Sequence, residues 1–171
     1  MAKEVKVSIE ISARDMYHFM LYHQYHSLTG VCYIIFGMMA LGMMFYAIFN
    51  MSFLYVAVMG LLFFFCILYQ PFGLYRKAAR QIRKNESFRR PITYVFHKDG
   101  IEVRQGENRG ELLWEDVSGV VLTKDLLMIY CGRIRANILP VSQLGPQQAA
   151  VLQCISEHIP QKRLKRIGNR R

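Results

Sequence analysis

The chain has 171 residues, of which 53% are hydrophobic and 20% are charged, and its net charge is +10. A chain that is both apolar and strongly basic indicates that the two properties lie in different segments. No Asp, Glu, Lys or Arg occurs from Met16 to Tyr75, whereas all but three of the 22 Lys and Arg residues follow that block. This division argues against a single soluble domain as the content of the whole chain. The four cysteines, without a C-x-x-C spacing, do not suggest a disulfide framework and fit a reducing compartment.

The first segment, residues 1–27, predicts a strand and a juxtamembrane helix. Val5, Val7 and Ile9 alternate with polar residues, which is the period of a half-buried strand. Ser12 to Asp15 predicts a helix start, and the apolar spacing that follows is helical. We expect this helix to lie against a membrane surface and to lead into a membrane span.

Residues 28–74 predict a transmembrane helical hairpin. The two expected spans are Leu28–Phe49 and Phe53–Leu74, with the polar break Asn50–Ser52 as a tight turn. Twenty-two helical residues cover about 33 Å, enough for a hydrocarbon core of about 30 Å. We expect a kink at the exit of the second span, marked by Pro71 and Gly73. Small residues could allow close helix contact: Gly37, Ala40, Gly42, Ala57 and Gly60.

Residues 75–90 predict a basic juxtamembrane helix or linker, helical from Arg76 to Ser87. Five of its cations are the candidate contacts to anionic lipid headgroups, each worth about 1 kcal/mol near the surface: Arg76, Lys77, Arg80, Arg83 and Lys84. Positive charge flanking a span favours the cytoplasmic side, and the Asn50 turn is neutral. We therefore predict a multi-pass protein of the cell membrane with both termini in the cytoplasm.

Residues 91–160 predict a small antiparallel β domain. The expected elements are strands 92–96, 101–104, 111–115 (centred on Trp114), 117–123, 126–131 and 133–139, then a helix from Gly145 to Ile159. Lys98-Asp99-Gly100 predicts a hairpin turn with Gly100 at positive φ, and Gly106 to Gly110 predicts a second loop. The strand 126–131 is apolar on both faces and is expected to be central, and the amino-terminal strand is a natural seventh.

The predicted fold class is therefore membrane α+β. A two-helix transmembrane hairpin is inserted between an amino-terminal strand and helix and a small curved sheet or partial barrel, capped by a carboxy-terminal helix. Residues 161–171 form a basic tail, expected to be solvated or associated with the membrane. The tail lacks interleaved aromatic residues and any nucleic-acid-binding fold, so we expect no nucleic acid partner.

This layout resembles the YcxB-like family of bacterial membrane proteins. The resemblance rests on Asp15-Met16-Tyr17-x-Phe19-x-x-Tyr22-His23, the two spans, the Tyr94 to Gly100 hairpin, Trp114 with Val120, Leu127 to Tyr130, and Ile138-Leu139-Pro140 with Leu144. It implies a cytoplasmic domain similar to pleckstrin-homology-like folds and implies no activity. One departure is Val141 where a basic residue is expected, which argues against a phosphate site there.

Several residues invite a chemical interpretation, and each has a plainer one. His18, His23 and His26 are spread around a helix, and Cys154 with His158 offers only two ligands, so we expect no metal site. Trp114 is expected in the core rather than in a ligand platform. Glu115 and Asp116, expected on opposite faces of a strand, cannot act as a carboxylate pair. We therefore predict no enzyme, no catalytic residues and no cofactor.

Three functions remain open. The first is a non-enzymatic membrane module whose cytoplasmic domain binds an unidentified protein or a lipid headgroup. The alternative is an oligomeric transport or pore accessory subunit that acts through its spans, although no charged residue lies within them. The third is headgroup recognition by the basic elements themselves. Membrane lipid is a partner in each of them, and a homo-oligomer is compatible with all three.

Overall fold

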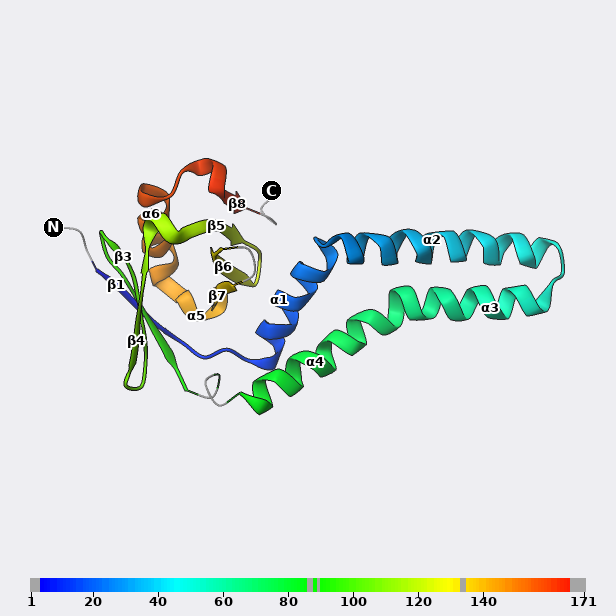
Figure 1. Ribbon diagram of the computed structural model, residues 1–171, viewed down its shortest axis with the longest axis horizontal. Coiled ribbons are helices and arrows are strands. Elements are labelled where there is room, and N and C mark those ends of the chain that lie inside the picture. Colours follow the sequence, from blue (N-terminus) through cyan, green and yellow to red (C-terminus); the bar gives the residue numbers. More distant parts are fainter. Residues whose placement is uncertain (1–3, 86–87, 89, 133–134, 167–171) are drawn as a thin grey trace. The chain divides into compact units, whose positions relative to one another are not determined.

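The computed structural model describes residues 4–85, 88, 90–132 and 135–166. The chain divides into two compact units (Figure 1). Residues 16–81 form a helical unit, and residues 1–15 together with 82–171 form a sheet domain. The architecture is α+β, with amino-terminal helices that include two long apolar ones, followed by two four-stranded sheets and a carboxy-terminal helix.

The helical unit begins with a capped helix and continues as a hairpin. Ser12 caps α1 (Ala13–Tyr25): its hydroxyl accepts from the Asp15 amide at 3.2 Å, and Asp15 Oδ2 accepts from the Ser12 amide at 2.9 Å. Helix α2 (Leu28–Phe49) has the predicted bounds, and the turn at Asn50–Ser52 is also confirmed. Both long helices are long and apolar enough to cross a membrane.

The second long helix continues directly from the predicted span into the basic helix predicted from Arg76, and it ends at Lys84. It runs without a break from Phe53 to Lys84 through α3 (Phe53–Phe63), the π-helical turn η1 (Phe64–Tyr69) and α4 (Gln70–Lys84). Pro71 explains the irregular turn, since proline has no amide hydrogen and its ring clashes with the carbonyl four residues earlier in a regular α-helix. The wider turn precedes Pro71, and the helix changes direction there (Figure 1).

The two long helices contact each other through small residues. Gly37 is buried, and a Cβ atom there would lie 2.6 Å from the Ile67 side chain. Ala40 is also buried, and a Cβ atom at Gly60 would meet Met44 Sδ at 3.5 Å. These three of the five predicted small residues therefore lie at or near the contact. Gly42 and Ala57 are exposed instead.

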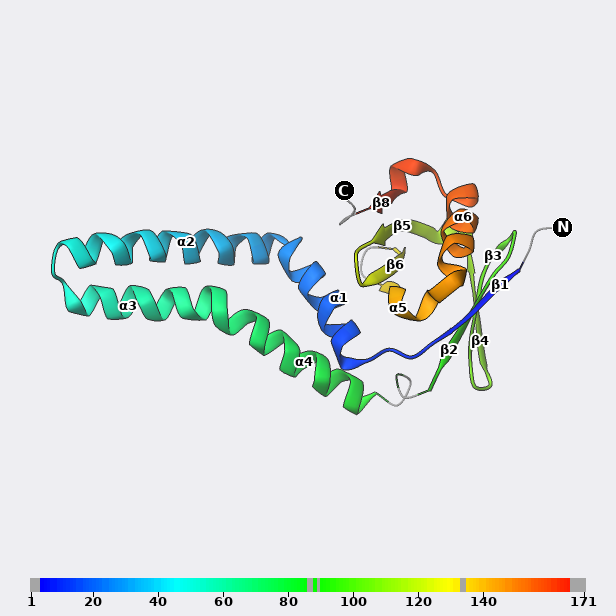
Figure 2. The same ribbon diagram turned by 180° about the vertical axis from the view of Figure 1, so that it is seen from behind.

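The described residues of the sheet domain form eight strands rather than seven. One sheet has the order β1-β2-β3-β4, whose four strands are labelled in Figure 2, and the other has the order β7-β6-β5-β8. The pairing of β1 with β2, from Val5–Phe96 to Ile9–Ile92, confirms that the amino-terminal strand joins the carboxy-terminal domain, and β6 is central as predicted. The strands are β1 Val5–Ile9, β2 Ile92–Phe96, β3 Gly100–Gln105, β4 Asn108–Leu113, β5 Val117–Leu122, β6 Leu126–Cys131, β7 Arg135–Pro140 and β8 Leu164–Arg166.

Three details of the predicted strands were wrong. Strand β4 ends at Leu113, so Trp114, Glu115 and Asp116 form a 3-10 turn (η3) and do not alternate between strand faces. The expected loop from Gly106 to Gly110 is only a two-residue turn, because Gln105 already pairs with Asn108. Part of the basic tail is structural, since β8 pairs in parallel with β5 and Arg163 Nη1 donates to the Val117 carbonyl at 3.2 Å. The predicted start of the sixth strand, Arg133 and Ile134, lies outside the described residues.

The two sheets and α6 (Gln148–His158) enclose one apolar core. Its fully buried side chains come from β2, β3, β5, β6, β7 and α6: Phe96, Ile101, Val117, Leu127, Leu139, Val151 and Ile155. The short helix α5 (Val141–Leu144), which the sequence did not predict, fixes the end of β1. Gln143 accepts from the Glu10 amide at 2.7 Å and donates to the Glu10 carbonyl at 2.8 Å.

One polar chain of contacts links the two sheets. The Tyr94 hydroxyl donates to Asn137 Oδ1 at 3.4 Å, and Asn137 Nδ2 donates to Cys131 Sγ at 3.5 Å. Burial raises the pKa of the Tyr94 hydroxyl above its ordinary value and also raises the pKa of the Cys131 thiol. Both groups therefore stay neutral near pH 7, so the core does not have to solvate a charge at this position.

Gly100 is required for a different reason from the predicted one. Positive φ occurs at Gly106, Gly132 and Gly145, whereas Gly100 starts β3 in an ordinary conformation. A Cβ atom at Gly100 would collide with the Leu112 carbonyl oxygen on β4. The close approach of two strands, rather than the turn, therefore excludes a side chain there.

We predict that Gly100→Ala destabilises the sheet domain by about 1–3 kcal/mol, because the new methyl group forces β3 and β4 apart. Gly110→Ala is the matched control, since a Cβ atom at that β4 position meets nothing within 4 Å. Urea unfolding of the full chain in detergent, followed by fluorescence of the single tryptophan Trp114, measures both. Equal urea midpoints of unfolding for Gly100→Ala and Gly110→Ala would contradict the predicted collision between a Gly100 side chain and the Leu112 carbonyl.

Candidate functional site

The basic residues of α4 form one continuous face. Successive helical residues are rotated by about 100°, which places the five predicted headgroup contacts within an arc of about 120°. All five are exposed: Arg76, Lys77, Arg80, Arg83 and Lys84. Helix α4 contains no Asp or Glu, so the helix itself supplies no carboxylate to neutralise this face. The structure therefore brings together all the residues that the sequence singled out.

The opposite side of α4 is apolar and largely enclosed. Ala78 is 0% exposed, and Leu74 and Ile82, four residues to either side, are half-buried. At the edge of this side, the Tyr75 ring contacts Tyr17 of α1 edge-on at 5.5 Å. The helix is thus amphipathic, with its cations directed away from the protein and its apolar residues directed inward.

Two aromatic residues belong to this site although the sequence analysis did not assign them. Phe72 lies one turn before Arg76, whose guanidinium carbon is 6.0 Å from the ring centroid, at the outer limit of a cation–π contact. The i, i+4 spacing of these two residues could have indicated the contact. The approach of Tyr17 to Tyr75 has no such signal, because the two residues are far apart in the sequence.

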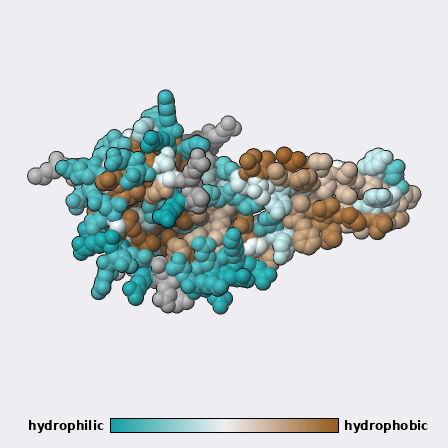
Figure 3. All heavy atoms as spheres, in the orientation of Figure 1, coloured by the Kyte–Doolittle hydropathy of each residue, from teal (hydrophilic) through white to brown (hydrophobic). Residues whose placement is uncertain are grey.

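The long helices next to α4 carry an outward apolar surface. All the exposed large hydrophobic side chains of the described residues, except Leu113, lie between Tyr25 and Tyr75. The hydrophobic colouring in Figure 3 follows the hairpin, whereas hydrophilic residues predominate over the sheet domain. The basic face of α4 therefore begins where this apolar surface ends.

His23 in α1 and His26, just after this helix, lie against aromatic rings. His26 stacks on Tyr22 with ring centroids 4.1 Å apart, and His23 meets Phe19 edge-on at 4.9 Å. Burial raises the pKa of the Tyr22 hydroxyl. Among the residues that the structure describes, no group of three His, Cys, Asp or Glu side chains is placed to hold a metal ion.

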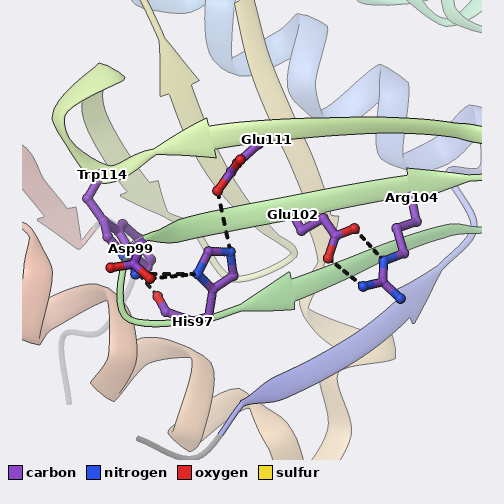
Figure 4. A network of polar contacts seen from close by, with 6 residues as sticks. All are labelled: His97, Asp99, Glu102, Arg104, Glu111 and Trp114. Atoms are coloured by element: carbon purple, nitrogen blue, oxygen red, sulfur yellow. Dashed lines mark hydrogen bonds and ion pairs between the residues drawn. The ribbon is translucent and has the colours of Figure 1, made fainter.

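The other candidates belong to the sheet domain. The His158 ring stacks on Trp114 at 4.9 Å, while its Nδ1 lies 2.8 Å from the Cys154 carbonyl oxygen. Trp114 is 9% exposed and donates through Nε1 to the His97 carbonyl at 3.0 Å, so it lies in the core (Figure 4). Glu115 and Asp116 are both exposed in the 3-10 turn.

Comparison with known proteins identifies part of the sheet domain. Residues 96–153, from the end of β2 into α6, match the family described as YcxB-like protein. The predicted family resemblance is therefore confirmed for this segment. No curated protein and no solved structure matches the chain.

We predict that the two sides of α4 respond oppositely to an added lysine. Ala78→Lys introduces a charge on the fully enclosed side and is expected to destabilise the helical unit by at least about 2 kcal/mol. Gln81→Lys adds the same side chain at an exposed position beside the basic face and is expected to change stability by less than about 0.5 kcal/mol. Thermal unfolding in detergent, followed by helical circular dichroism, compares the two, and similar melting temperatures would contradict the assigned faces.

Proposed function

We propose that this chain, YcxB-like over residues 96–153, is a non-enzymatic, multi-pass protein of the cell membrane. In this proposal the helical hairpin spans the bilayer, and the basic face of α4 binds anionic headgroups on the cytoplasmic side. The sheet domain acts as a small pleckstrin-homology-like module that is held at that surface and is available to a protein partner.

The observation that carries the proposal is the outward apolar surface of the hairpin. Many large hydrophobic side chains of both helices are exposed, whereas the buried residues of α2 are only glycine and alanine. Exposing such a surface to water is costly at about 25 cal/mol per Å² of apolar area, and a bilayer removes that cost. The length of α2 also matches the thickness of a hydrocarbon core.

The pairing of β1 with β2 supports the orientation. Because β1 precedes the hairpin and β2 follows it, both flanks of the hairpin must lie on the same side of a membrane. Positive charge next to a span favours the cytoplasmic side, and the five cations of α4 occupy the last turns of the second long helix. The turn at Asn50–Ser52 carries no charge and is the part that would cross to the outside.

Headgroup binding follows from the charge and exposure of α4. Five cations on one arc, without an acidic residue on the same helix, attract anionic lipid at about 1 kcal/mol per residue near the surface. The contact of Phe72 with Arg76 adds an aromatic ring at the level where interfacial aromatic residues concentrate.

Cysteine labelling tests the topology. In a background with Cys32, Cys66, Cys131 and Cys154 replaced by serine, Asn50→Cys should react with a membrane-impermeant maleimide on intact cells. Asn85→Cys, exposed just beyond α4, should react only after lysis. Labelling of Asn85→Cys on intact cells would contradict the orientation, and full-length protein that stays soluble and monomeric without detergent would contradict membrane insertion.

A second experiment tests headgroup binding. The full chain, carrying a polarity-sensitive dye at Asn85→Cys, is titrated in zwitterionic micelles with phosphatidylglycerol. Lys77→Gln/Arg80→Gln should weaken the response at least about tenfold, because two contacts of about 1 kcal/mol each are lost. Lys98→Gln/Lys124→Gln removes two exposed charges from the sheet domain and serves as the control. Headgroup binding is wrong if neither the α4 variant nor 0.5 M salt weakens the response.

A further inference from the structure

Strand β4 is an uncovered edge of the first sheet. It stands at the end of the order β1-β2-β3-β4, and no other strand in the described part of the chain pairs with its outer side. Asn108 to Glu111 and Leu113 are exposed, and Leu112 is half-buried. Among the described residues, Leu113, at 39% exposure, is the large exposed hydrophobic residue that lies outside residues 25–75. The outer backbone groups of β4 are therefore accessible to another strand.

The other three edge strands are protected in ways that β4 is not. Proteins block edge pairing with charged side chains, above all lysine, with proline or with a very short strand. Strand β1 carries Lys6, β7 ends in Pro140, and β8 has three residues with two cations. Strand β4 has six residues, Asn-Arg-Gly-Glu-Leu-Leu, with neither lysine nor proline, and its two charges, Arg109 and Glu111, are of opposite sign, so they can attract rather than repel a second copy.

The hairpin turn determines which residues of β4 direct their backbone groups outward. Gln105 pairs with Asn108 across the two-residue turn Gly106-Glu107, and the first and last residues of such a turn share a hydrogen bond. In an antiparallel ladder, hydrogen-bonded and non-hydrogen-bonded pairs alternate. Asn108, Gly110 and Leu112 thus bond to β3. The free amide and carbonyl groups belong to Arg109, Glu111 and Leu113.

The charges on β4 are poorly matched within its own sheet. Arg109 lies opposite Arg104 on β3, and Glu111 lies opposite Glu102. Like charges directly opposite each other destabilise a sheet. Glu102 and Arg104 satisfy each other, since Arg104 Nε donates to Glu102 Oε1 at 2.7 Å (Figure 4). Glu111 lies near His97 instead. His97 Nε2 is 4.0 Å from Glu111 Oε1, and the Glu111 side chain is 59% exposed.

We propose that β4 pairs with β4 of a second copy of this chain, antiparallel and centred on Gly110. In this register Arg109 of each copy lies directly opposite Glu111 of the other, so two opposite-charge pairs form around one two-fold axis. The register is also the one that the backbone allows, because Arg109 and Glu111 are residues with outward amide and carbonyl groups. The β1-β2-β3-β4 sheets of the two copies then join into one sheet of eight strands.

Gly110 suits the centre of this pairing. It forms a non-hydrogen-bonded pair with Gly110 of the partner copy, the kind of pair in which the Cα atoms approach to about 4.5 Å. A Cβ atom at Gly110 meets nothing within 4 Å in one copy, so the position can accept a side chain. That distance is within the range that a disulfide can bridge.

Tethering raises the strength of the interaction. A short edge pairing between freely diffusing molecules is weak, whereas two copies held in one membrane meet at a much higher effective concentration. Only this gain in concentration rests on the proposed membrane location. The register and the charge pairs are properties of β4 and can be tested separately from the labelling of Asn50→Cys and Asn85→Cys.

Disulfide crosslinking tests the register. In the full chain without its native cysteines, reconstituted in phospholipid vesicles, Gly110→Cys should form a covalent dimer rapidly under mild oxidation. Asn108→Cys is the matched control on the same face of β4. In the proposed register the two copies of residue 108 are four positions apart, about 13 Å along the strands, and cannot be bridged.

A charge exchange tests the pairing chemistry. In the Gly110→Cys chain, Arg109→Glu or Glu111→Arg alone places like charges opposite each other at both ends, and each should slow crosslinking at least about fivefold. The double change, Arg109→Glu/Glu111→Arg, restores opposite charges and should restore crosslinking. Each single change also relieves a like-charge pair with β3, so loss of crosslinking cannot be attributed to unfolding. Trp114 fluorescence verifies that the sheet domain stays folded.

Two results would overturn the proposal. The first is equal crosslinking of Gly110→Cys and Asn108→Cys, which indicates random collision or a different partner for this edge. The second is a double charge variant that crosslinks as slowly as the single variants, which excludes the Arg109–Glu111 pairs. Fast and selective crosslinking through Gly110→Cys, with recovery in the double variant, establishes the pairing.

Discussion

The arrangement of large and small side chains on the helical hairpin is the constraint on which the rest of the structure depends. In a soluble helix bundle, large apolar residues fill the contact and polar residues face outward. Here the buried residues of α2 are Gly30, Gly37, Ala40 and Ala47, and the large residues face outward. Both helices are long and apolar enough to cross a membrane, and the bilayer proposed above is an environment that suits such a surface.

The same constraint explains why the sheet domain is divided in sequence. Val5 pairs with Phe96, so one ladder of the sheet joins chain segments separated by the entire helical unit. Closing a flexible loop of that length has an entropic cost that grows slowly with length. An antiparallel helical hairpin reduces this cost, because its two ends lie close together. The reciprocal hydrogen bonds between Glu10 and Gln143 then fix β1 at its end.

The sequence predicted the elements whose signals are local and missed those that depend on distant contacts. The alternation of Val5, Val7 and Ile9 and the apolar run 126–131 correctly indicated strands, since each pattern lies within one element. The basic face of α4 was predictable for the same reason. Strand β8 was missed because its stability comes from β5, more than 40 residues earlier. Gly100 was assigned to the wrong cause because the Leu112 carbonyl that excludes a side chain belongs to another strand.

The bend before α4 links the apolar surface to the basic face. From Arg76 to Lys84 a helix rises about 12 Å, whereas the polar layer of one leaflet is only about 5–8 Å thick. A straight helix along the membrane normal would therefore carry Lys84 beyond the headgroups that Arg76 reaches. The π-helical turn Phe64–Tyr69 and Pro71 lie just before the cations, and α4 leaves the direction of α3 there (Figure 1). In the proposed binding mode, a helix tilted toward the membrane plane brings all five cations to one depth, and we propose that Pro71 positions them as well as altering the helix locally.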